Sequence, residues 1–431
     1  MRTIVQALAA LSRGAVRLRA AAAARPNLPR RVLLAVATSI CLSGVIGGST
    51  AWALWSDEVW VVTWAAGPHA GNEFAPYTQF AAQTTLRQIV RVSSGGTRVR
   101  VRLSNESGSQ PLVIGAAHVG LRSSGAGVVP ASDRLLTFGG ANSVTIPAGA
   151  PALSDPVTLD VPAQSDLAVS IYLPNAVTAG TRHYFSLQTN YLSQFGDYTG
   201  MPVPPVSSTV QSYFFLTAVD VLSVTGASAV AVLGDSITDG YRSTTDANRR
   251  WTNVLTERLQ AARIPVAVAN EGISANRVVR NVTGASAITR FDRDVLAQAG
   301  VKYAIVLEGI NDIGLGALAS AEPVTADQLI AGYRQLIARA HQKGVRIFGA
   351  TLPPFEGAGY YSAEGEGKRQ AVNNWIRTSG EYDAVIDFDQ AIRDPGHPSR
   401  LRPLYDSGDH LHPNDAGYRA MGQAIVLQLF Q

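Results

Sequence analysis

The sequence contains almost no cysteine and few charged side chains. Its single cysteine, Cys41, lies in the N-terminal stretch that we interpret below as a targeting segment. A chain that has lost this segment has no disulfide and no thiol chemistry, so its stability must come from its core. Charged residues make up only 16% of the chain and hydrophobic residues 46%, which excludes an intrinsically disordered protein and provides for a large core.

Dense clusters of basic residues are also absent beyond the N-terminus. The formal net charge is +4, but many of the arginines fall in the first 31 residues. No run of lysine and arginine of the kind that binds nucleic acid follows them. We therefore expect no nucleic-acid partner.

The N-terminal stretch has the pattern of a signal segment. Arg30 and Arg31 precede an apolar run at 32–46, and the A-W-A sequence at 51–53 provides an A-x-A cleavage site. We expect residues 1–53 to be removed, which makes the protein secreted or periplasmic. An uncleaved membrane anchor is the alternative, because the apolar run can be extended toward ~20 residues.

The length of 431 residues suggests two domains, and the first has the pattern of an all-β fold. Residues 59–225 consist of short strand patterns separated by turns, which predicts a β-sandwich of the jelly-roll type. The motif R-V-R-V-R-L at 98–103 alternates strictly, so we expect Val99, Val101 and Leu103 to face the core. The other face carries arginines that we expect to be solvated, with an anionic glycan as the alternative contact: Arg98, Arg100 and Arg102.

The second predicted domain, at 227–431, has the pattern of an α/β fold. An apolar stripe at 329–340 predicts a helix, and a final helix is expected at about 414–430. Helices that alternate with buried strands predict a parallel sheet covered on both faces. The buried strands are expected in short apolar runs at 229–233, 266–269, 303–307, 345–350 and 384–388.

Four polar motifs follow these predicted strands or occupy the last loop. They are G-D-S-I-T-D-G at 234–240, N-E-G-I-S at 270–274, E-G-I-N-D at 308–312 and D-H-L-H-P at 409–413. Ligands of open α/β sheets bind at the carboxyl ends of the strands, so we expect these motifs to meet. A serine at the end of a buried strand, with an Asp/His pair elsewhere, is the pattern of an activated nucleophile.

The four blocks, in this order, resemble those of the SGNH/GDSL-type hydrolases. The resemblance covers about residues 228–430 and any one block alone is weak, since G-D-S recurs by chance. It implies a three-layer α/β/α domain at 227–431, preceded here by the β-sandwich.

The resemblance also implies the catalytic roles. Ser236 is the expected nucleophile, His412 the general base and Asp409 the residue that orients the imidazole. The D-x-x-H spacing selects Asp409 and His412 over the neighbouring Asp406 and His410.

An oxyanion hole is implied in the same way. Its expected donors are the backbone N–H groups of Ser236 and Gly272 and the side-chain amide of Asn311. For Gly272 a plain turn, and for Asn311 a turn cap, are the alternatives. We expect Asp235 and Asp312 to hold loops through backbone hydrogen bonds.

No metal and no cofactor is expected. A metal bound by His410 and His412 is the alternative, but the chain has no H-E-x-x-H motif and no third ligand group. Four aromatic residues near the motifs are expected to pack in the core or at its rim, with the lining of a substrate cleft as the alternative: Trp251, Phe355, Tyr360 and Tyr361.

Together these features predict a secreted serine esterase that removes acetyl groups from a carbohydrate. Hydrolysis of lipid or aryl esters is one alternative, and an O-acyltransferase that acts on sugars is another. A carbohydrate-binding protein with an idle catalytic domain is a third, against which the complete set of blocks argues. The expected partner is an acylated carbohydrate, with no stable membrane partner once the signal is cleaved.

Replacing the nucleophile tests this prediction directly. Ser236→Ala should abolish ester hydrolysis and leave the fold intact, because it removes one hydroxyl at the end of a strand. A serine-directed phosphonate should label the wild type and not the variant, as measured by mass spectrometry. Labelling of another serine would show that the assignment is wrong.

Overall fold

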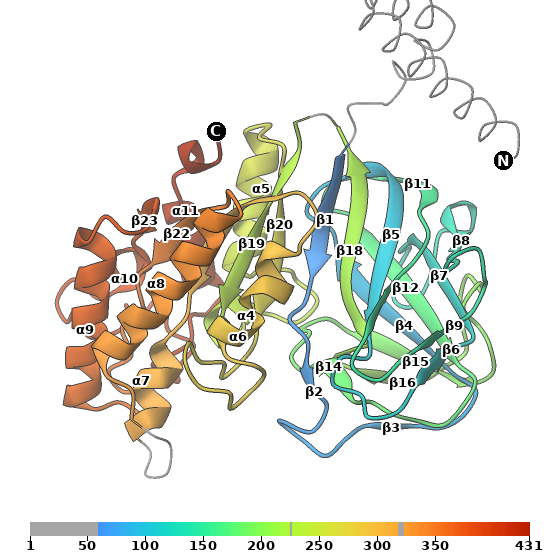
Figure 1. Cartoon of the computed structure of the whole chain (residues 1–431), viewed down its shortest axis with the longest axis horizontal. Helices are drawn as coiled ribbons and strands as arrows, with labels where there is room; N and C mark the ends of the chain where they lie inside the picture. The colour runs from blue at the N-terminus through green and yellow to red at the C-terminus, as the bar shows by residue number, and fades with distance from the viewer. Residues whose placement is uncertain (1–58, 225, 318–322) are drawn as a thin grey trace, which may run out of the picture. The chain divides into compact units, whose positions relative to one another are not determined.

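The computed structural model describes residues 59–224, 226–317 and 323–431, so the predicted signal segment 1–53 and Cys41 lie outside it. Residues 58–431 form one unit that contains antiparallel and parallel sheets (Figure 1). The change from antiparallel to parallel sheets falls between β18 (Leu216–Ser223) and β19 (Ser228–Gly234). The division at 59–225 and 227–431 itself stays a prediction. We refer to the two parts as the β-region and the α/β-region.

Two antiparallel sheets form the body of the β-region, and side chains from both fill one apolar core. The all-β prediction is confirmed, and within the described part before Ser223 the one helical turn is η1 (Pro130–Ser132). The first sheet contains β1 (Val59–Ala65), β18, β5 (Gly96–Ser104), β10 (Pro151–Leu153) and β11 (Val157–Val161). The second contains β16 (Val206–Val210), β15 (Asn190–Phe195), β4 (Thr84–Arg91), β12 (Asp166–Leu173), β7 (Ala116–Leu121) and β8 (Arg134–Leu135). Shorter pairings are made by β2 (His69–Ala70), β14 (Thr181–His183) and β17 (Tyr213–Phe214), by β3 (Gln79–Phe80) and β13 (Val177–Thr178), and by β6 (Leu112–Ile114) and β9 (Val144–Ile146).

Strand β5 shows the predicted alternation, with a different outcome for its arginines. Its three apolar side chains are fully buried. Arg98 is exposed, as expected. Arg100 instead donates to Asp220 Oδ2 at 2.8 Å and lies 4.4 Å over the ring of Trp60. Arg102 donates to Gln298 of the α/β-region at 3.2 Å. Arg98 Nη2 also donates to the carbonyl oxygen of Pro156, at 3.5 Å. All three arginines therefore bind the protein itself, which leaves little of this face for a glycan.

The α/β-region has the predicted parallel sheet, with strand order β20-β19-β21-β22-β23 and helices on both faces (Figure 1). The other strands are β20 (Val266–Gly272), β21 (Val301–Leu307), β22 (Arg346–Ala350) and β23 (Ala384–Ile386). The helices are α4 (Ser236–Asp239), α5 (Trp251–Ala261), α6 (Ala287–Phe291), η2 (Asp292–Leu296), α7 (Ile310–Ala317), α8 (Ala326–Gln342), α9 (Ala363–Thr378), α10 (Phe388–Ile392), α11 (Asp415–Ala424) and η3 (Leu427–Phe430). The three-layer α/β/α fold is confirmed.

The last helix is shorter than predicted. It ends at Ala424, because Ile425 is extended with ψ 125°. Arg258 Nη1 donates to the carbonyl oxygens of Gly422 at 2.6 Å and Ile425 at 2.7 Å, and so caps the helix end. The apolar residues of η3 continue the hydrophobic pattern beyond this stop, which is why the pattern alone does not reveal it.

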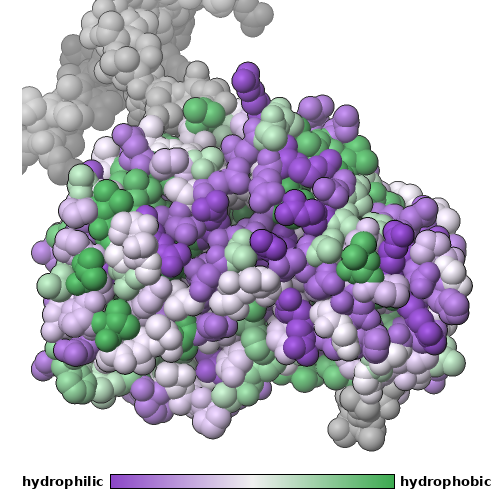
Figure 2. Space-filling view, turned by 180° about the vertical axis from the view of Figure 1, so that it is seen from behind, coloured by the Kyte–Doolittle hydropathy of each residue, from purple (hydrophilic) through white to green (hydrophobic). Residues whose placement is uncertain are grey.

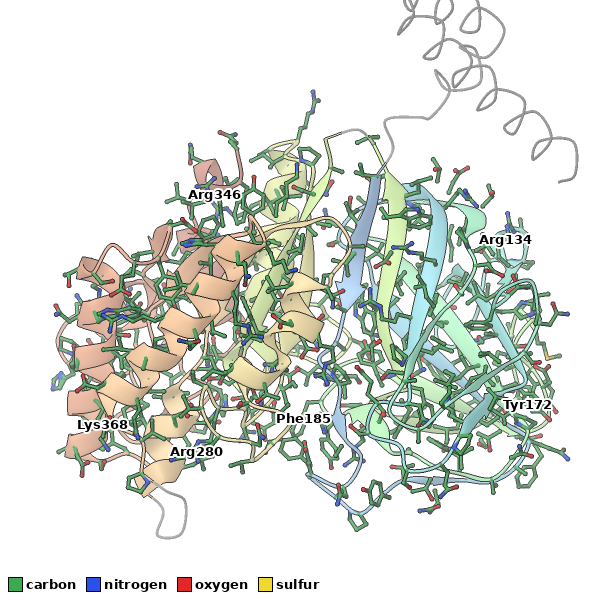
Figure 3. All side chains as sticks on the ribbon, viewed as in Figure 1. Arg134, Tyr172, Phe185, Arg280, Arg346 and Lys368 are labelled. Atoms are coloured by element: carbon green, nitrogen blue, oxygen red, sulfur yellow. The ribbon has the colours of Figure 1, made fainter. Side chains whose placement is uncertain are left out.

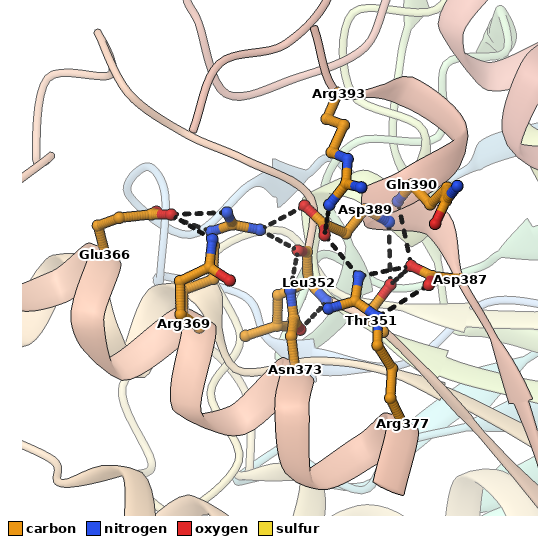
Figure 4. Close-up of polar contacts among 11 residues, drawn as sticks. Thr351, Leu352, Glu366, Arg369, Asn373, Arg377, Asp387, Asp389, Gln390 and Arg393 are labelled. Atoms are coloured by element: carbon orange, nitrogen blue, oxygen red, sulfur yellow. Dashed lines mark hydrogen bonds and ion pairs between the residues drawn. The ribbon is translucent and has the colours of Figure 1, made fainter. Parts of the chain in front are cut away.

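A buried ionic network fixes α9 to α10 and to the end of β22 (Figure 4). Arg369 and Asp389 have fully buried side chains, and Arg369 Nη1 lies 2.7 Å from Asp389 Oδ1. Arg369 also donates to Glu366 and to the carbonyl oxygen of Leu352. Buried charges are tolerated only when they are paired in this way, so removing one partner would be strongly destabilising.

The two regions share part of one core. Ala229, Ala267 and Ala269 of the parallel sheet pack among the apolar side chains of the β-region. Hydrogen bonds also join the regions: Val62 N–H donates to Ala299 O at 2.9 Å, and Val268 N–H donates to Ser93 Oγ at 2.9 Å. Small side chains let the strands approach closely. Hydrophilic side chains predominate on the outer face seen in Figure 2.

Residues 227–431 expressed alone should therefore aggregate or lose stability. The truncation exposes the apolar face of β20, and an exposed edge strand invites pairing with other chains. Size-exclusion chromatography and thermal unfolding of the truncated and full chains measure the effect. A monomeric truncated form with the Tm of the full chain would reduce the β-region to a passive appendage.

Candidate active site

Ser236 is the first residue of the short helix α4, directly after β19. Asp235 caps this helix by accepting a hydrogen bond from Ile237 N–H at 2.9 Å. Gly234 is required before the turn, because a Cβ there would clash with Thr238 Oγ1. Gly240 ends the helix in the left-handed region, at φ 93°. The strand-to-helix turn thus presents the serine hydroxyl at the carboxyl edge of the sheet.

The structure brings the three predicted catalytic residues into one line. Ser236 Oγ lies 2.7 Å from His412 Nε2, and His412 Nδ1 lies 2.8 Å from Asp409 Oδ2. The second oxygen of Asp409 accepts the backbone N–H groups of His412 at 2.8 Å and Leu411 at 3.1 Å. With Nδ1–H donated to Asp409, Nε2 is free to accept the serine proton, which is the arrangement of an activated nucleophile.

Asp409 stays ionised in this setting. Burial by itself would raise the pKa of Asp409, but the hydrogen bonds from the side chain and backbone of His412 and from Leu411 hold it well below its ordinary range. Arg242 Nε lies 3.2 Å from Asp409 Oδ2. A carboxylate that stays ionised at this point is able to orient the imidazole of His412 and to stabilise an imidazolium, as its predicted role requires.

The neighbouring residues His410 and Asp406 pair with each other and not with Ser236. His410 Nδ1 is 2.6 Å from Asp406 Oδ2, and the His410 side chain is half exposed. His410 has a positive φ of 63°, and its ring lies against Gly357, where a side chain would collide with it. The geometry therefore favours His412 and Asp409, although their catalytic roles stay a prediction.

The predicted oxyanion donors have different outcomes. Ser236 N–H has no hydrogen-bond partner within the described ranges, as a donor to substrate requires. Gly272 is placed differently from the prediction. It ends β20, and its N–H donates to Asn270 Oδ1 at 2.9 Å. A side chain at Gly272 would run into the backbone of Asp239, so the glycine serves the packing of β20 against α4.

Ala275 replaces Gly272 as the candidate backbone donor. It occupies the left-handed region at φ 61° in a turn closed by Asn276 N–H to Ile273 O at 3.0 Å. Its own N–H has no partner in the part of the chain that the structure describes. Ser274, just before it, is held by Asp239 Oδ2 through its hydroxyl at 2.7 Å. The sequence gives no sign of this position, because a turn residue in the left-handed region is more often glycine than alanine.

Asn311 lies at the start of α7 with its side-chain amide held at both ends. Nδ2 donates to the carbonyl oxygen of Asn276 at 3.0 Å, and Oδ1 accepts from Tyr360 OH at 3.2 Å. An amide nitrogen carries two hydrogens, so one remains for a substrate oxygen. The amide can thus still donate one hydrogen bond, and its role as an oxyanion donor stays a prediction.

The family model for the GDSL-like lipase/acylhydrolase family matches residues 232–420, which include all of these positions. These residues are a GDSL-like lipase/acylhydrolase domain. The chain is a carboxylic ester hydrolase. A search of curated protein sequences found no match to it.

Several solved structures resemble the GDSL-like domain. An acetyl xylan esterase from Geobacillus stearothermophilus is 23% identical, with 47% of this chain and 95% of that chain covered and a TM-score of 0.37. An α/β hydrolase from the metagenome of Lake Arreo is 21% identical, with 47% and 94% covered and a TM-score of 0.37. A GDSL-like lipase from Bacteroides thetaiotaomicron is 17% identical, with 47% and 87% covered and a TM-score of 0.36.

Within residues 59–224, 226–317 and 323–431, no group of three or more His, Cys, Asp or Glu side chains is arranged to hold a metal ion. No helix in these ranges is both long and apolar enough to cross a membrane.

Three buried acids, Asp235, Glu308 and Asp312, lie within the motifs of the GDSL-like domain. Burial raises the pKa of Asp235 to about 7 and that of Asp312 to about 6, and raises that of Glu308 well above its ordinary value. Asp312 accepts from the backbone N–H groups of Val278 at 2.7 Å and Val279 at 3.2 Å. Together with the cap made by Asp235, these bonds agree with the expectation that both aspartates hold loops.

Of the four aromatic residues expected near the motifs, three pack in the core or at its rim and one contacts a predicted site residue. Trp251 and Phe355 are fully buried in the core, and Tyr361 packs on Phe355 with ring centroids 5.1 Å apart. Tyr360 alone reaches a predicted site residue, through Asn311.

A different set of aromatic side chains adjoins His412. The ring of Tyr241 meets that of His412 edge-on at 4.8 Å, and Phe185 meets Tyr241 at 5.2 Å. Phe185 belongs to the β-region and lies near the junction of the two regions (Figure 3). Tyr184 and Phe74 continue the row, at 4.6 Å and 5.1 Å from Phe185. We call these four partly exposed residues the aromatic strip. The sequence pattern missed it, because its members come from three separate segments.

The β-region also contacts α4, the helix that begins with Ser236, through His183. His183 Nε2 lies 3.1 Å from Asp239 Oδ1, and Nδ1 lies 3.0 Å from Gly67 O. Burial by itself would lower the pKa of His183, but the charge and hydrogen bond of Asp239 outweigh this effect, so the net result is a raised pKa. Behind this pair is a cavity of about 340 Å³ that His183, Asp239 and Arg250 help to line.

The two histidines of the last loop provide a matched comparison. His412→Ala should lower turnover by roughly 10⁴-fold or more, and Asp409→Asn should fall between that variant and the wild type. His410→Ala should retain activity, because its ring does not contact Ser236. Steady-state hydrolysis of an aryl acetate measures all three. An inactive His410→Ala variant with a normal His412→Ala variant would reverse the assignment.

Proposed function

We propose that this chain is a secreted serine esterase that removes O-acetyl groups from carbohydrates. The observation that carries the esterase mechanism is the line of Ser236, His412 and Asp409, with separations of 2.7 Å and 2.8 Å. Secretion rests on the signal pattern at 1–53.

The geometry supports a two-step acyl transfer. Ser236 Oγ attacks the ester carbonyl carbon while His412 Nε2 takes its proton. The negative charge that forms on the carbonyl oxygen is stabilised by hydrogen bonds from Ser236 N–H, Ala275 N–H and the amide of Asn311. The C–O bond to the alcohol then breaks as His412 returns the proton to the leaving oxygen. Water, deprotonated by His412, attacks the acyl-enzyme, releases the acid and restores the serine.

The aromatic strip supports a carbohydrate as the alcohol part. The strip starts at the ring of Tyr241, which lies beside His412. In the proposed mechanism His412 protonates the leaving alcohol, so the alcohol part of the substrate is expected on that side. Sugars offer C–H faces that pack on aromatic rings and hydroxyl groups at their edges. Tyr184 and Tyr241 combine an aromatic ring with a hydrogen-bonding hydroxyl, which suits both features. On this proposal the β-region supplies one wall of the substrate site through Phe185.

A substrate panel with the full chain tests the proposal. Acetate release from acetylated oligosaccharides should exceed acid release from aryl esters of lengthening acyl chain. Phe185→Ala should raise KM for the acetylated oligosaccharide about fivefold, the effect of losing about 1 kcal/mol of aromatic contact, with little change for a small aryl acetate.

The control is Phe195→Ala, which removes an exposed aromatic side chain of the same region outside the strip. It should leave both substrates unaffected. A preference that grows with acyl length would favour lipid or aryl esters instead. An acylated sugar as the main product, when a sugar acceptor is added, would identify an acyltransferase.

A further inference from the structure

We propose that Tyr360 is a positioning residue for ester hydrolysis, because its hydroxyl holds the Asn311 amide in the orientation that donates to the oxyanion. The inference rests on the proposed function, in which Asn311 is an oxyanion donor. Its basis is the hydrogen bond from Tyr360 OH to Asn311 Oδ1, at 3.2 Å across 49 residues of chain.

Orientation matters because the two ends of an amide have opposite polarity. A half-turn of the Asn311 side chain would exchange Oδ1 and Nδ2, and would place a carbonyl oxygen where the substrate oxyanion forms. One neighbour sets the orientation of the amide and the other restrains it. The carbonyl oxygen of Asn276 can only accept, so it requires Nδ2 on its side, at 3.0 Å. A tyrosine hydroxyl can donate or accept, and with Nδ2 on Asn276 the Tyr360 OH donates to Oδ1 at 3.2 Å and restrains that end of the amide. The second hydrogen of Nδ2 is then left for the substrate.

The ring of Tyr360 is itself fixed against the helix that carries Asn311. Gly314 lies three residues after Asn311 on α7, and therefore on the same face. A side chain at Gly314 would collide with the Tyr360 ring, so the glycine makes room for it. Phe355 packs on the ring from another direction, with centroids 6.1 Å apart. The hydroxyl thus reaches Asn311 from a ring with little freedom to move.

Tyr360 also keeps its proton, as a donor must. Burial, followed by the charges of Asp235 and Asp409, raises the pKa of the Tyr360 hydroxyl well above its ordinary value. The group is therefore a neutral donor throughout the pH range in which a serine esterase works.

Tyr361 provides the matched control. It is the next residue in the chain, its ring packs on the same Phe355, and its hydroxyl has no hydrogen-bond partner in the described ranges. Replacing either tyrosine with phenylalanine removes one oxygen atom and keeps the ring. A role in packing alone predicts two similar variants.

The experiment compares four variants of the full chain on a small aryl acetate. Tyr360→Phe should lower kcat roughly tenfold with KM within about twofold of the wild type, since the orienting bond is lost and the donor itself remains. Tyr361→Phe should match the wild type. Asn311→Ala should lose roughly 10²–10³-fold in kcat. Adding Tyr360→Phe to Asn311→Ala should cause no further loss, because residues that act through one another are not additive. Thermal unfolding confirms that each variant is folded.

Three results would overturn the inference. One is a Tyr360→Phe variant with wild-type kcat, and another is a loss that multiplies with that of Asn311→Ala. The third is an equal loss in Tyr361→Phe. Failure of the proposed function looks different: the wild type would hydrolyse no ester, or Ser236→Ala would hydrolyse it equally well. A Ser236-dependent esterase with normal Tyr360→Phe kinetics would refute the positioning role alone.

Discussion

The hydrogen bond between Ser236 and His412 joins residues 176 positions apart in the chain. The surrounding structure holds Ser236 Oγ at 2.7 Å from His412 Nε2. On one side, Asp235 caps α4 and Gly234 lets the turn close against Thr238. On the other, one carboxylate, Asp409, accepts both the ring and the backbone of His412. Each end is fixed locally, so the fold of the α/β-region needs only to bring two rigid pieces together.

Asp239 extends this control into the β-region. One of its oxygens lies 3.1 Å from His183, and the other accepts the hydroxyl and N–H of Ser274. Because Asp239 ends the helix that Ser236 begins, one carboxylate connects this helix, the loop of the candidate donor Ala275 and the β-region. Arg250 strengthens the junction by donating to the carbonyl oxygens of Asp239 and Ser186. The β-region therefore supports the site by direct contact as well as by covering β20.

The sequence predicts which residues meet at the candidate site where the signal is local. Ser236, Asn311 and His412 each follow a recognisable strand or motif, and topology brings strand ends to one edge. Gly272 shows where this reasoning stops, since a glycine can serve close packing as well as donation, and only the occupied N–H distinguishes them. The contacts of Tyr360 and Phe185 depend on residues far apart in the chain, which no periodicity reveals. Arg100 is a similar case, because its partner Asp220 lies 120 residues away.

The buried acids make the stability of the α/β-region depend on pH. Burial raises the folded-state pKa of Asp235 to about 7 and that of Asp312 to about 6, above the ~3.9 of an unfolded aspartate. Burial favours their neutral forms, so the stability associated with them is fully present below about pH 4. It is lost as the pH rises through 6 and 7. Arg290 limits this loss. It donates to Gly234 O at 3.0 Å and lies 3.7 Å from Glu308, and its charge favours the ionised forms of Asp235 and Glu308.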